Sequence, residues 1–447
     1  MIFVSKKLLK QLSESRGIIS WLIWRGLFLY RMFRYFLASL IQFYYVVRYR
    51  KDDIIKAVFV APIHSSHFQY FLSKFEASFP QNKHLCIMLI NSDPTSLVAS
   101  VSWRHLLVDK PMYRVFGYSV PEHWLDDLWG LAEHNLNPLG KTILYKAINR
   151  FTPQLIWIHD LQSAGYLVND QLSELRDKGS KFLVCCSVWG NDLYFFHEHP
   201  LHRQKLTHLL EKVDFLHGEC PRDGVLAKNI GFDGILLPTC SPTLGGKVDS
   251  DACDLAPGVD RELFLVVKSD YPYRTNLLTF IDQIDSNPCY WANKAICFMP
   301  LSPGLAFAVE KLKFRHGLNI EILKSCNIEN FQNILSNSKF FLTCNLSDGS
   351  PMSIVAATNA GCVSIFSNHT GICDLVREKK LFNLIFDFNN VEFTSVFEKL
   401  VGNEHIYLGH LRELIQHSVI NEVRYDEVLS TVNRALLTQV ELQKRLI

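Results

Sequence analysis

Residues 347–361, with the sequence SDGSPMSIVAATNAG, combine residue types that can hold an anionic group at the start of a helix. Ser350 suits the N-cap, Pro351 suits the first helical turn, and Gly361 suits the end of the helix. A helix that begins near Pro351 presents free backbone N–H groups and the positive end of its dipole, an arrangement that binds phosphate. Because ordinary capped helices carry the same signals, the pattern predicts the helix and leaves the phosphate site open as an interpretation.

The apolar run KFFLTC (339–344) directly precedes this segment, and similar runs recur along the chain. Short apolar runs separated by helix-length segments are typical of parallel sheets covered on both faces, whose ligands bind at the carboxyl ends of the strands. In the first half of the chain the runs are AVFVAP (57–62), CIMLIN (86–91), LIWIH (155–159), KFLVCCSVW (181–189), VDFLHG (213–218) and GILLP (234–238). In the second half they are LFLVVK (263–268), AICFMP (295–300), LNIEIL (318–323), KFFLTC (339–344) and CVSIF (362–366). A linker rich in Pro and Gly separates the two sets, so we expect two doubly wound α/β domains.

Length and charge narrow the class of protein. A chain of 447 residues suits two domains, and its 20% charged and 48% hydrophobic residues exclude both a disordered chain and a multispan membrane protein. The net charge of +2 conceals an asymmetry, because residues 1–50 contain nine Lys and Arg against one Glu. The remainder, with 37 basic and 43 acidic residues, is mildly acidic, which argues against nucleic-acid binding over a broad surface.

The basic N-terminal segment has the character of a membrane-associated helix. Residues 18–47 are rich in Trp, Tyr, Phe and Leu, but Arg25, Arg31 and Arg34 interrupt them at what would be bilayer depth. Most of the basic residues fall on one side of a helix, opposite a broad aromatic face, as in an interfacial helix. We therefore expect peripheral attachment to the cytoplasmic face of an anionic membrane. The alternative is a helix packed on the protein body, since basic side chains also extend over protein surfaces.

Metal and disulfide signals are lacking in the sequence. Twelve cysteines occur without a C-x-x-C pair, and Cys185 and Cys186 are adjacent within an apolar run, as expected for reduced core residues of a cytoplasmic protein. Asp249, Ser250 and Asp251 form a D-x-D sequence, but it lies in the polar linker without a preceding apolar strand. We interpret it as a solvated loop.

Residues 347–376 resemble the donor-binding segment of retaining glycosyltransferases of the GT-B fold. In that family an acidic residue and a Gly open a loop, a helix follows, and a Glu stands eight positions after the first acid. Asp348, Gly349 and Pro351 match this pattern, and the following small-residue helix that ends at Gly361 is also similar. Ala356 departs from it, because it stands where the family has Glu.

Three further segments resemble the same family in the same order. TPQLIWIHDLQSAGYL (152–167) is similar to a strand that ends in His-x-His, with His159 as the second His and Trp157 in place of the first. SVWGNDLYFF (187–196) resembles a Gly-Ser-Asp segment, with Asn191 in place of Ser. Lys268 and Arg274 resemble the basic pair that grips the donor diphosphate, with a spacing one residue longer than usual.

The resemblance implies an α/β protein of two Rossmann-like domains facing across a cleft. We expect a basic amphipathic membrane-associating segment at 1–50, an acceptor domain at 51–243, a nucleotide-sugar domain at 244–404, and C-terminal helices at 405–447. It further implies that no cofactor or metal is needed, because cationic side chains and the helix start can neutralise the leaving diphosphate.

The resemblance also assigns roles to individual residues. Catalytic roles fall to His159, which would face the reacting sugar, and to Asp348, which would bind its hydroxyls. The residues assigned to the donor are Lys268, Arg274, Gly349, Ser350 and Ser353. Those assigned to the acceptor are His64, His67, Asn191 and Asp192. Each assignment has a structural alternative: a solvated strand end for the cations, a turn-capping side chain for Asp348, and a hydrogen-bonded core residue for His159.

The expected activity is sugar transfer with retention of configuration from a nucleotide sugar to a lipid-linked, polysaccharide or glycolipid acceptor. The setting by analogy is the assembly of a bacterial surface polysaccharide such as lipopolysaccharide. Two alternatives remain open: a non-catalytic scaffold of the same fold, which Ala356 favours, and a sugar-nucleotide epimerase, which has little need of a membrane segment.

Overall fold

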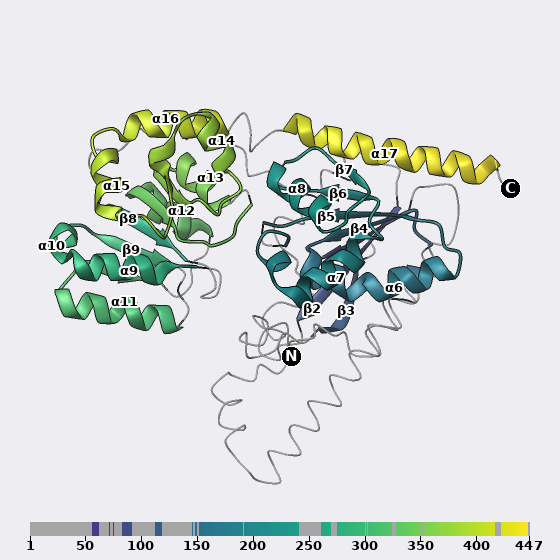
Figure 1. The fold of residues 1–447 in the computed structure, drawn as a ribbon, viewed down its shortest axis with the longest axis horizontal. Coiled ribbons are helices and arrows are strands. Elements are labelled where there is room, and N and C mark those ends of the chain that lie inside the picture. Colours follow the sequence, from purple (N-terminus) through teal and green to yellow (C-terminus); the bar gives the residue numbers. More distant parts are fainter. Residues whose placement is uncertain are drawn as a thin grey trace, which may run out of the picture.

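The computed structural model describes two α/β domains and two C-terminal helices, shown side by side in Figure 1. The described residues are 56–61, 71, 75, 83–91, 112–118, 145, 148–149, 152–190, 192–240, 261–269, 275–299, 301, 303–323, 328–349, 352–415 and 422–445. The expected helix within residues 1–50 and the D-x-D sequence at 249–251 lie outside them. No helix in these ranges is both long enough and apolar enough to cross a membrane.

The first domain is built on a seven-stranded sheet in the order β3-β2-β1-β4-β5-β6-β7. The strands are β1 (Lys56–Ala61), β2 (Lys83–Asn91), β3 (Met112–Tyr118), β4 (Leu155–His159), β5 (Leu183–Ser187), β6 (Phe215–His217) and β7 (Ile235–Leu236). All of their pairings are parallel. The helices of this domain are α6 (Tyr166–Asp177), α7 (Pro200–Leu210) and α8 (Pro221–Asn229), with a π-helical turn at Leu161–Gly165 and a 3-10 turn at Phe196–Glu198.

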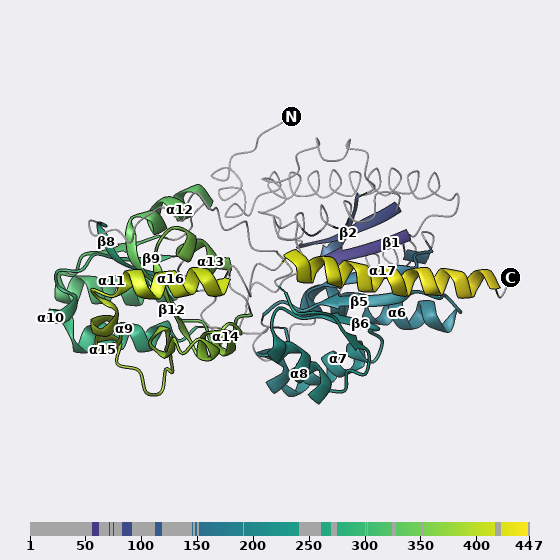
Figure 2. The same ribbon diagram turned by 90° about the horizontal axis from the view of Figure 1, so that it is seen from above.

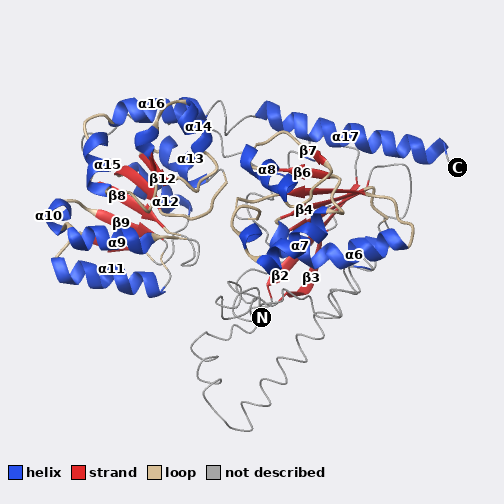
Figure 3. Cartoon of the chain, in the orientation of Figure 1, coloured by secondary structure: helices blue, strands red, loops and turns tan. Residues whose placement is uncertain are grey.

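The second domain is built on a six-stranded parallel sheet in the order β10-β9-β8-β11-β12-β13. Its strands are β8 (Leu263–Lys268), β9 (Ile296–Met299), β10 (Ile320–Ile322), β11 (Ser338–Thr343), β12 (Val363–Ser367) and β13 (Ile385–Phe386). Its helices are α9 (Leu277–Ser286), α10 (Pro288–Trp291), α11 (Pro303–His316), α12 (Ile328–Ser336), α13 (Met352–Asn359), α14 (Cys373–Glu378), α15 (Phe393–Leu400) and α16 (Glu404–Leu414), with a 3-10 turn at Phe382–Leu384. Figure 3 shows helices flanking both sheets.

This architecture confirms the expected α/β class with two parallel Rossmann-like sheets and C-terminal helices. Each apolar run that the sequence predicted as a strand contains a strand in the structure. The sequence did not predict β3, whose MYRVFGY sequence places Arg114 and Gly117 within the strand, or β13, which has only two residues.

Successive side chains along each strand point to opposite faces of the first sheet, so each face has its own hydrophobic core. Val58 and Ile156 belong to the face covered by α6 and α7, whereas Phe59 and Trp157 belong to the opposite face. The second face is covered by α17 (Glu422–Arg445), whose buried residues recur at helical spacing. They are Val428, Leu429, Val432 and Leu436.

The two C-terminal helices therefore serve different domains. Leu408 and Leu411 of α16 lie in the core of the second domain, while α17 runs along the first (Figure 2). The chain thus returns to its first domain after completing the second, which gives the two domains a second connection besides the linker.

Leu436 and Leu437 test the packing of α17, because they are neighbours on opposite sides of the helix. The side chain of Leu436 is 0% exposed and that of Leu437 is 49% exposed. We expect Leu436→Ala to lower the free energy of unfolding of the first domain by about 2–5 kcal/mol, and Leu437→Ala to change it by less than about 0.5 kcal/mol. Urea unfolding followed by circular dichroism measures both. Equal losses would contradict the packing of α17 on the first sheet.

Candidate functional site

The carboxyl edges of the two sheets contact one another through their loops. Ser347, after β11, donates its hydroxyl hydrogen bond to the carbonyl of Gly190, after β5, over 3.4 Å. Arg222, in the first turn of α8, donates to the carbonyls of Asp348 and His369 over 2.8 and 2.7 Å. Because ligands of parallel sheets bind at this edge, the junction of the two domains is the candidate site.

Glycines at the junction let the two backbones approach closely. A Cβ built on Gly190 would overlap the backbone N of Gly349, and a Cβ built on Gly349 would overlap the Glu219 carboxylate. Gly349 is one of the residues assigned to the donor, and the structure places it at the meeting point of the domains. A side chain at position 190 would therefore meet backbone of the second domain, whereas one at position 349 would meet the Glu219 side chain.

Lys268 and Ser353, both assigned to the donor, lie together. Lys268 ends β8, in register with Thr343 of β11, and its ammonium group donates to the Ser353 hydroxyl in the first turn of α13 over 3.3 Å. The order of the second sheet reverses between β8 and β11, which is where open α/β sheets bind their ligands. A cation at the first turn of a helix creates a local preference for an anion.

Asp348 is held in one orientation by its own loop. One carboxylate oxygen accepts a hydrogen bond from the Gly349 N–H and the other from the Asn345 amide, each over 3.0 Å. The Asp348 backbone also forms a parallel bridge with Thr370. The turn-capping role of Asp348 is therefore present in the structure, and it orients the carboxylate that the sequence assigns to the sugar.

His159 ends β4 and is enclosed by aromatic side chains. It is 1% exposed, and its ring centroid lies 4.3 Å from that of Phe71 and 6.2 Å from that of Trp157. Burial, with a smaller contribution from His217, lowers the pKa of His159 to about 3. The imidazole is therefore neutral at physiological pH, which suits a hydrogen bond to an uncharged sugar and not the neutralisation of a phosphate.

Asp192 organises the loops at the edge of the first sheet. It is buried, and its Oδ2 accepts hydrogen bonds from the N–H groups of Leu161 and Trp189, each over 2.9 Å. Burial raises the pKa of this carboxyl well above its usual range, and the nearby Asp160 raises it further. These bonds tie the turn after β4 to the turn after β5. Contact between Asp192 and an acceptor stays a prediction.

Five of the assigned residues lie outside the described part of the chain. They are His64, His67, Asn191, Arg274 and Ser350. Asn191 falls between Gly190 and Asp192, both at the junction side of the first domain, and Arg274 precedes Thr275, whose backbone pairs with that of Asn345. The roles assigned to the five residues stay predictions.

Sequence reasoning missed four residues that the structure places at the junction. Glu219 accepts a hydrogen bond from the Gly190 N–H over 3.1 Å, while Arg222 contacts Tyr194 and His369. Glu219 and Arg222 directly follow the predicted strand VDFLHG, so the rule that ligands bind at carboxyl ends of strands could have indicated them. The carbonyls that Arg222 holds lie in the second domain, and no local pattern shows them.

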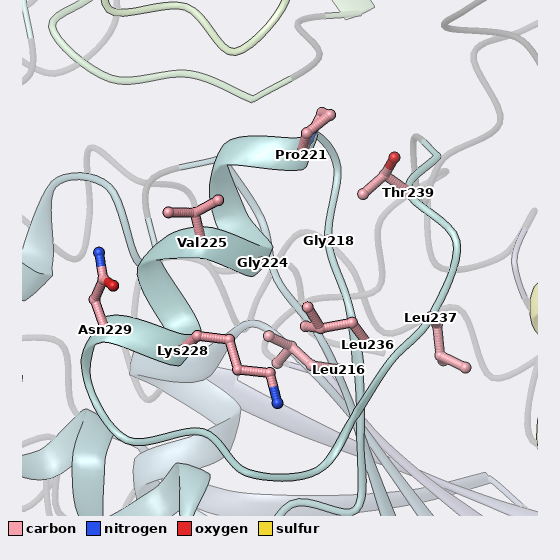
Figure 4. A pocket seen from close by; sticks show the side chains of 10 residues that line it. All are labelled: Leu216, Gly218, Pro221, Gly224, Val225, Lys228, Asn229, Leu236, Leu237 and Thr239. Atoms are coloured by element: carbon pink, nitrogen blue, oxygen red, sulfur yellow. The ribbon is translucent and has the colours of Figure 1, made fainter.

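A cavity beside α8 differs from the junction in its lining. A cavity of about 430 Å³ lies between α8 and strands β6 and β7 (Figure 4), but it is lined mainly by apolar groups such as Leu216, Val225 and Leu236. Its single charged lining residue, Lys228, donates to the carbonyl of Gly234. Within the described ranges, no group of three or more His, Cys, Asp and Glu side chains could hold a metal ion.

Several solved structures resemble most of the chain. Sucrose-phosphate synthase from Thermosynechococcus elongatus is 11% identical, with a TM-score of 0.62 over 87% of this chain and 100% of the other. The apo form of the lipopolysaccharide outer core galactosyltransferase WaaB is 12% identical, with a TM-score of 0.54 over 84% and 99%. Anabaena HepE in complex with UDP-glucose is 10% identical, with a TM-score of 0.53 over 87% and 99%. No protein-family model and no curated protein matches the sequence.

At these identities the likeness concerns the fold. The likeness extends over 84–87% of this chain, which contains the two parallel sheets. The chain therefore has the GT-B fold found in glycosyltransferases.

Proposed function

We propose that the protein is a glycosyltransferase that moves a sugar from a nucleotide-sugar donor to a membrane-borne, polysaccharide or glycolipid acceptor with retention of configuration. The observation that carries the proposal is the hydrogen bond between Lys268 and Ser353, where the order of the second sheet reverses. A cation at the first turn of α13 suits a diphosphate, which is the leaving group of a nucleotide sugar.

In this proposal the second domain holds the donor and the first holds the acceptor. Lys268, Arg274 and the start of α13 neutralise the charge that develops on the diphosphate, so that transfer proceeds without a metal. Ser350, Ser353 and Gly349 complete the contacts to the phosphates. Asp348 binds sugar hydroxyls as an acceptor-only carboxylate.

The acceptor side is proposed from the first domain. His159, neutral because burial lowers its pKa, faces the reacting sugar from the end of β4. His64, His67, Asn191 and Asp192 contact the acceptor. The leaving phosphate takes the proton of the acceptor hydroxyl, which dispenses with a protein base.

A non-catalytic scaffold is the second candidate, and Ala356 favours it. Ala356 lies three residues after Ser353 on the partly exposed side of α13, where the family pattern has Glu. Loss of that Glu removes charge-assisted hydrogen bonds to the nucleotide, each worth about 1.5–3 kcal/mol. A sugar-nucleotide epimerase is a third candidate, and the basic N-terminal segment argues against it.

A panel of UDP-, GDP-, ADP- and dTDP-activated sugars distinguishes the three candidates. A donor at 100 times its Kd contributes about 2.7 kcal/mol to folding, which raises the melting temperature measurably. The donor that stabilises the protein is then incubated with and without candidate acceptors. Release of the nucleoside diphosphate that depends on acceptor supports the transferase, binding without turnover supports the scaffold, and isomerised donor without acceptor supports the epimerase.

The proposed donor site makes Lys268 and Arg274 essential for turnover. We expect Lys268→Ala and Arg274→Ala each to lower kcat by about 100- to 1000-fold, because each removes a positive charge aimed at the developing phosphate charge. Lys339→Ala, at the amino end of β11, is the matched control and should retain wild-type turnover. Circular dichroism checks that all three variants fold. Wild-type rates for both site variants would remove these residues from the site.

Ala356→Glu tests whether α13 faces a nucleotide. If residue 356 faces the ribose, a carboxylate there adds charge-assisted bonds, and the Kd for the nucleotide sugar should fall roughly tenfold per bond. Ala356→Gln is the matched control, because it has the same size without the charge and should give a smaller gain. Calorimetry measures both. Unchanged affinity in Ala356→Glu would favour the scaffold.

The N-terminal segment is proposed to attach the protein to anionic lipid. A chain without residues 1–50 should remain folded but lose sedimentation with vesicles that contain phosphatidylserine, since the +8 segment supplies both apolar area and charge attraction. Vesicles of phosphatidylcholine alone serve as the control for charge. Equal sedimentation of the full and shortened chains would contradict this attachment.

A further inference from the structure

Arg222 links the two domains through a forked pair of hydrogen bonds. Its Nη1 donates to the His369 carbonyl over 2.7 Å and its Nη2 donates to the Asp348 carbonyl over 2.8 Å. The two acceptors lie in different loops of the second domain, after β12 and after β11. One planar guanidinium therefore holds two loops at once, which an ammonium group cannot do with the same geometry.

Tyr194 holds the guanidinium from the side of the first domain. The Arg222 Cζ lies 3.7 Å from the centroid of the Tyr194 ring, a cation–π contact, and the Tyr194 hydroxyl lies 2.8 Å from His369 Nδ1. Burial, together with the charge of Arg222, lowers the pKa of His369, although Asp387 opposes this shift. Arg222, Tyr194 and His369 thus contact one another in a closed ring, which we call the interdomain clasp.

The loop that carries Arg222 is itself well anchored. Asp223 is 0% exposed, and its Oδ2 accepts hydrogen bonds from the N–H groups of Glu219 and Cys220 over 2.9 and 3.2 Å. These bonds fix the turn between β6 and α8. The Arg222 side chain therefore extends from a turn that is fixed within the first domain.

The loop that Arg222 holds contains Asp348 and Gly349. The Asp348 carbonyl accepts from both the Arg222 guanidinium and the Gly371 N–H, the latter over 2.9 Å. Gly349 in turn lies against Gly190 and Glu219. A longer hydrogen bond, 3.4 Å from the Ser347 hydroxyl to the Gly190 carbonyl, also joins the two domains beside the clasp.

We infer that Arg222 is a positioning residue that keeps the Asp348 loop against the first domain and thereby holds the two domains closed for transfer. This inference rests on the proposed glycosyltransferase function. Arg222 acts through the loop, so its loss should lower turnover while leaving the phosphate contacts of Lys268 and Ser353 in place.

Closure of the two domains can be measured in the full chain, without substrate, from the rate at which a disulfide forms between them. A Cβ built on Gly371 would lie 2.5 Å from the Cys220 sulfur and 2.9 Å from the Gly349 carbonyl oxygen, so Gly371→Cys brings one thiol from each domain together once the loop at Gly349 has shifted slightly. Diamide takes up two electrons and two protons as the S–S bond forms, and the closed chain migrates faster on a non-reducing gel. The double variant Gly371→Cys with Cys220→Ser controls for other cysteines.

Adding Arg222→Ala to Gly371→Cys should slow disulfide formation by roughly tenfold or more, because two charge-assisted hydrogen bonds are lost. Arg222→Lys should restore part of the rate, since an ammonium group can reach one of the two carbonyls. Arg203→Ala, an exposed arginine of α7, should leave the rate unchanged. An equal rate in Arg222→Ala would overturn the clasp.

Kinetics separate a positioning role from a structural one. With the nucleotide sugar that stabilises the protein, Arg222→Ala should lower kcat about 10- to 100-fold and change the donor KM less than about threefold. A parallel rise in donor KM with a fall in melting temperature would overturn the inference in favour of a structural role. If no nucleotide sugar binds while the disulfide still depends on Arg222, the proposed function fails and the clasp remains.

Discussion

The parallel pairing of all named strands is the constraint on which the rest of the structure depends. Parallel pairing sends the carboxyl ends of all strands in a sheet to one edge, so the loops after β5, β6, β11 and β12 have to lie along two such edges. The edges approach most closely at Gly190, where a Cβ would lie 2.0 Å from the backbone N of Gly349. Topology therefore determines where chemistry can occur, and the residues at the junction determine what that chemistry can be.

Both domains bring charged groups to the junction. On the side of the second domain, Lys268 and the first turn of α13 favour an anion. On the side of the first domain, the Glu219 carboxylate accepts the Gly190 N–H, and the Arg222 guanidinium donates to the Asp348 carbonyl. A carboxylate accepts hydrogen bonds from hydroxyl groups, so Glu219 is compatible with an uncharged ligand. The cation beside α13 is the group that supports a donor on the second domain.

The sequence predicted the elements that local patterns encode, but not the contacts between residues that lie far apart in the chain. Continuous apolar runs identified the central strands, because a strand buried on both faces has few alternatives. The run that forms β3 contains Arg114 and Gly117 and carries no such signal. The periodicity of α17 indicated an apolar face without indicating which sheet would receive it. Arg222 is 126 and 147 positions from the residues whose carbonyls it holds, and no spacing rule covers such a contact.

Ala356 illustrates how a site residue can be lost without loss of the fold. The buried side of α13 is formed by Ile354, Val355, Ala357 and Thr358, whereas residue 356 is only partly buried. Ala356 nevertheless packs against the core of the second domain, so the size of the side chain there is limited on one side. The same helix keeps Ser353 against Lys268, and the loop before it is held by the interdomain clasp. A scaffold that bound no nucleotide sugar would need neither a cation at the start of this helix nor a fixed loop beside it. Their presence together favours a site that still binds a nucleotide sugar, with weaker contacts to the nucleotide than Glu at position 356 would provide.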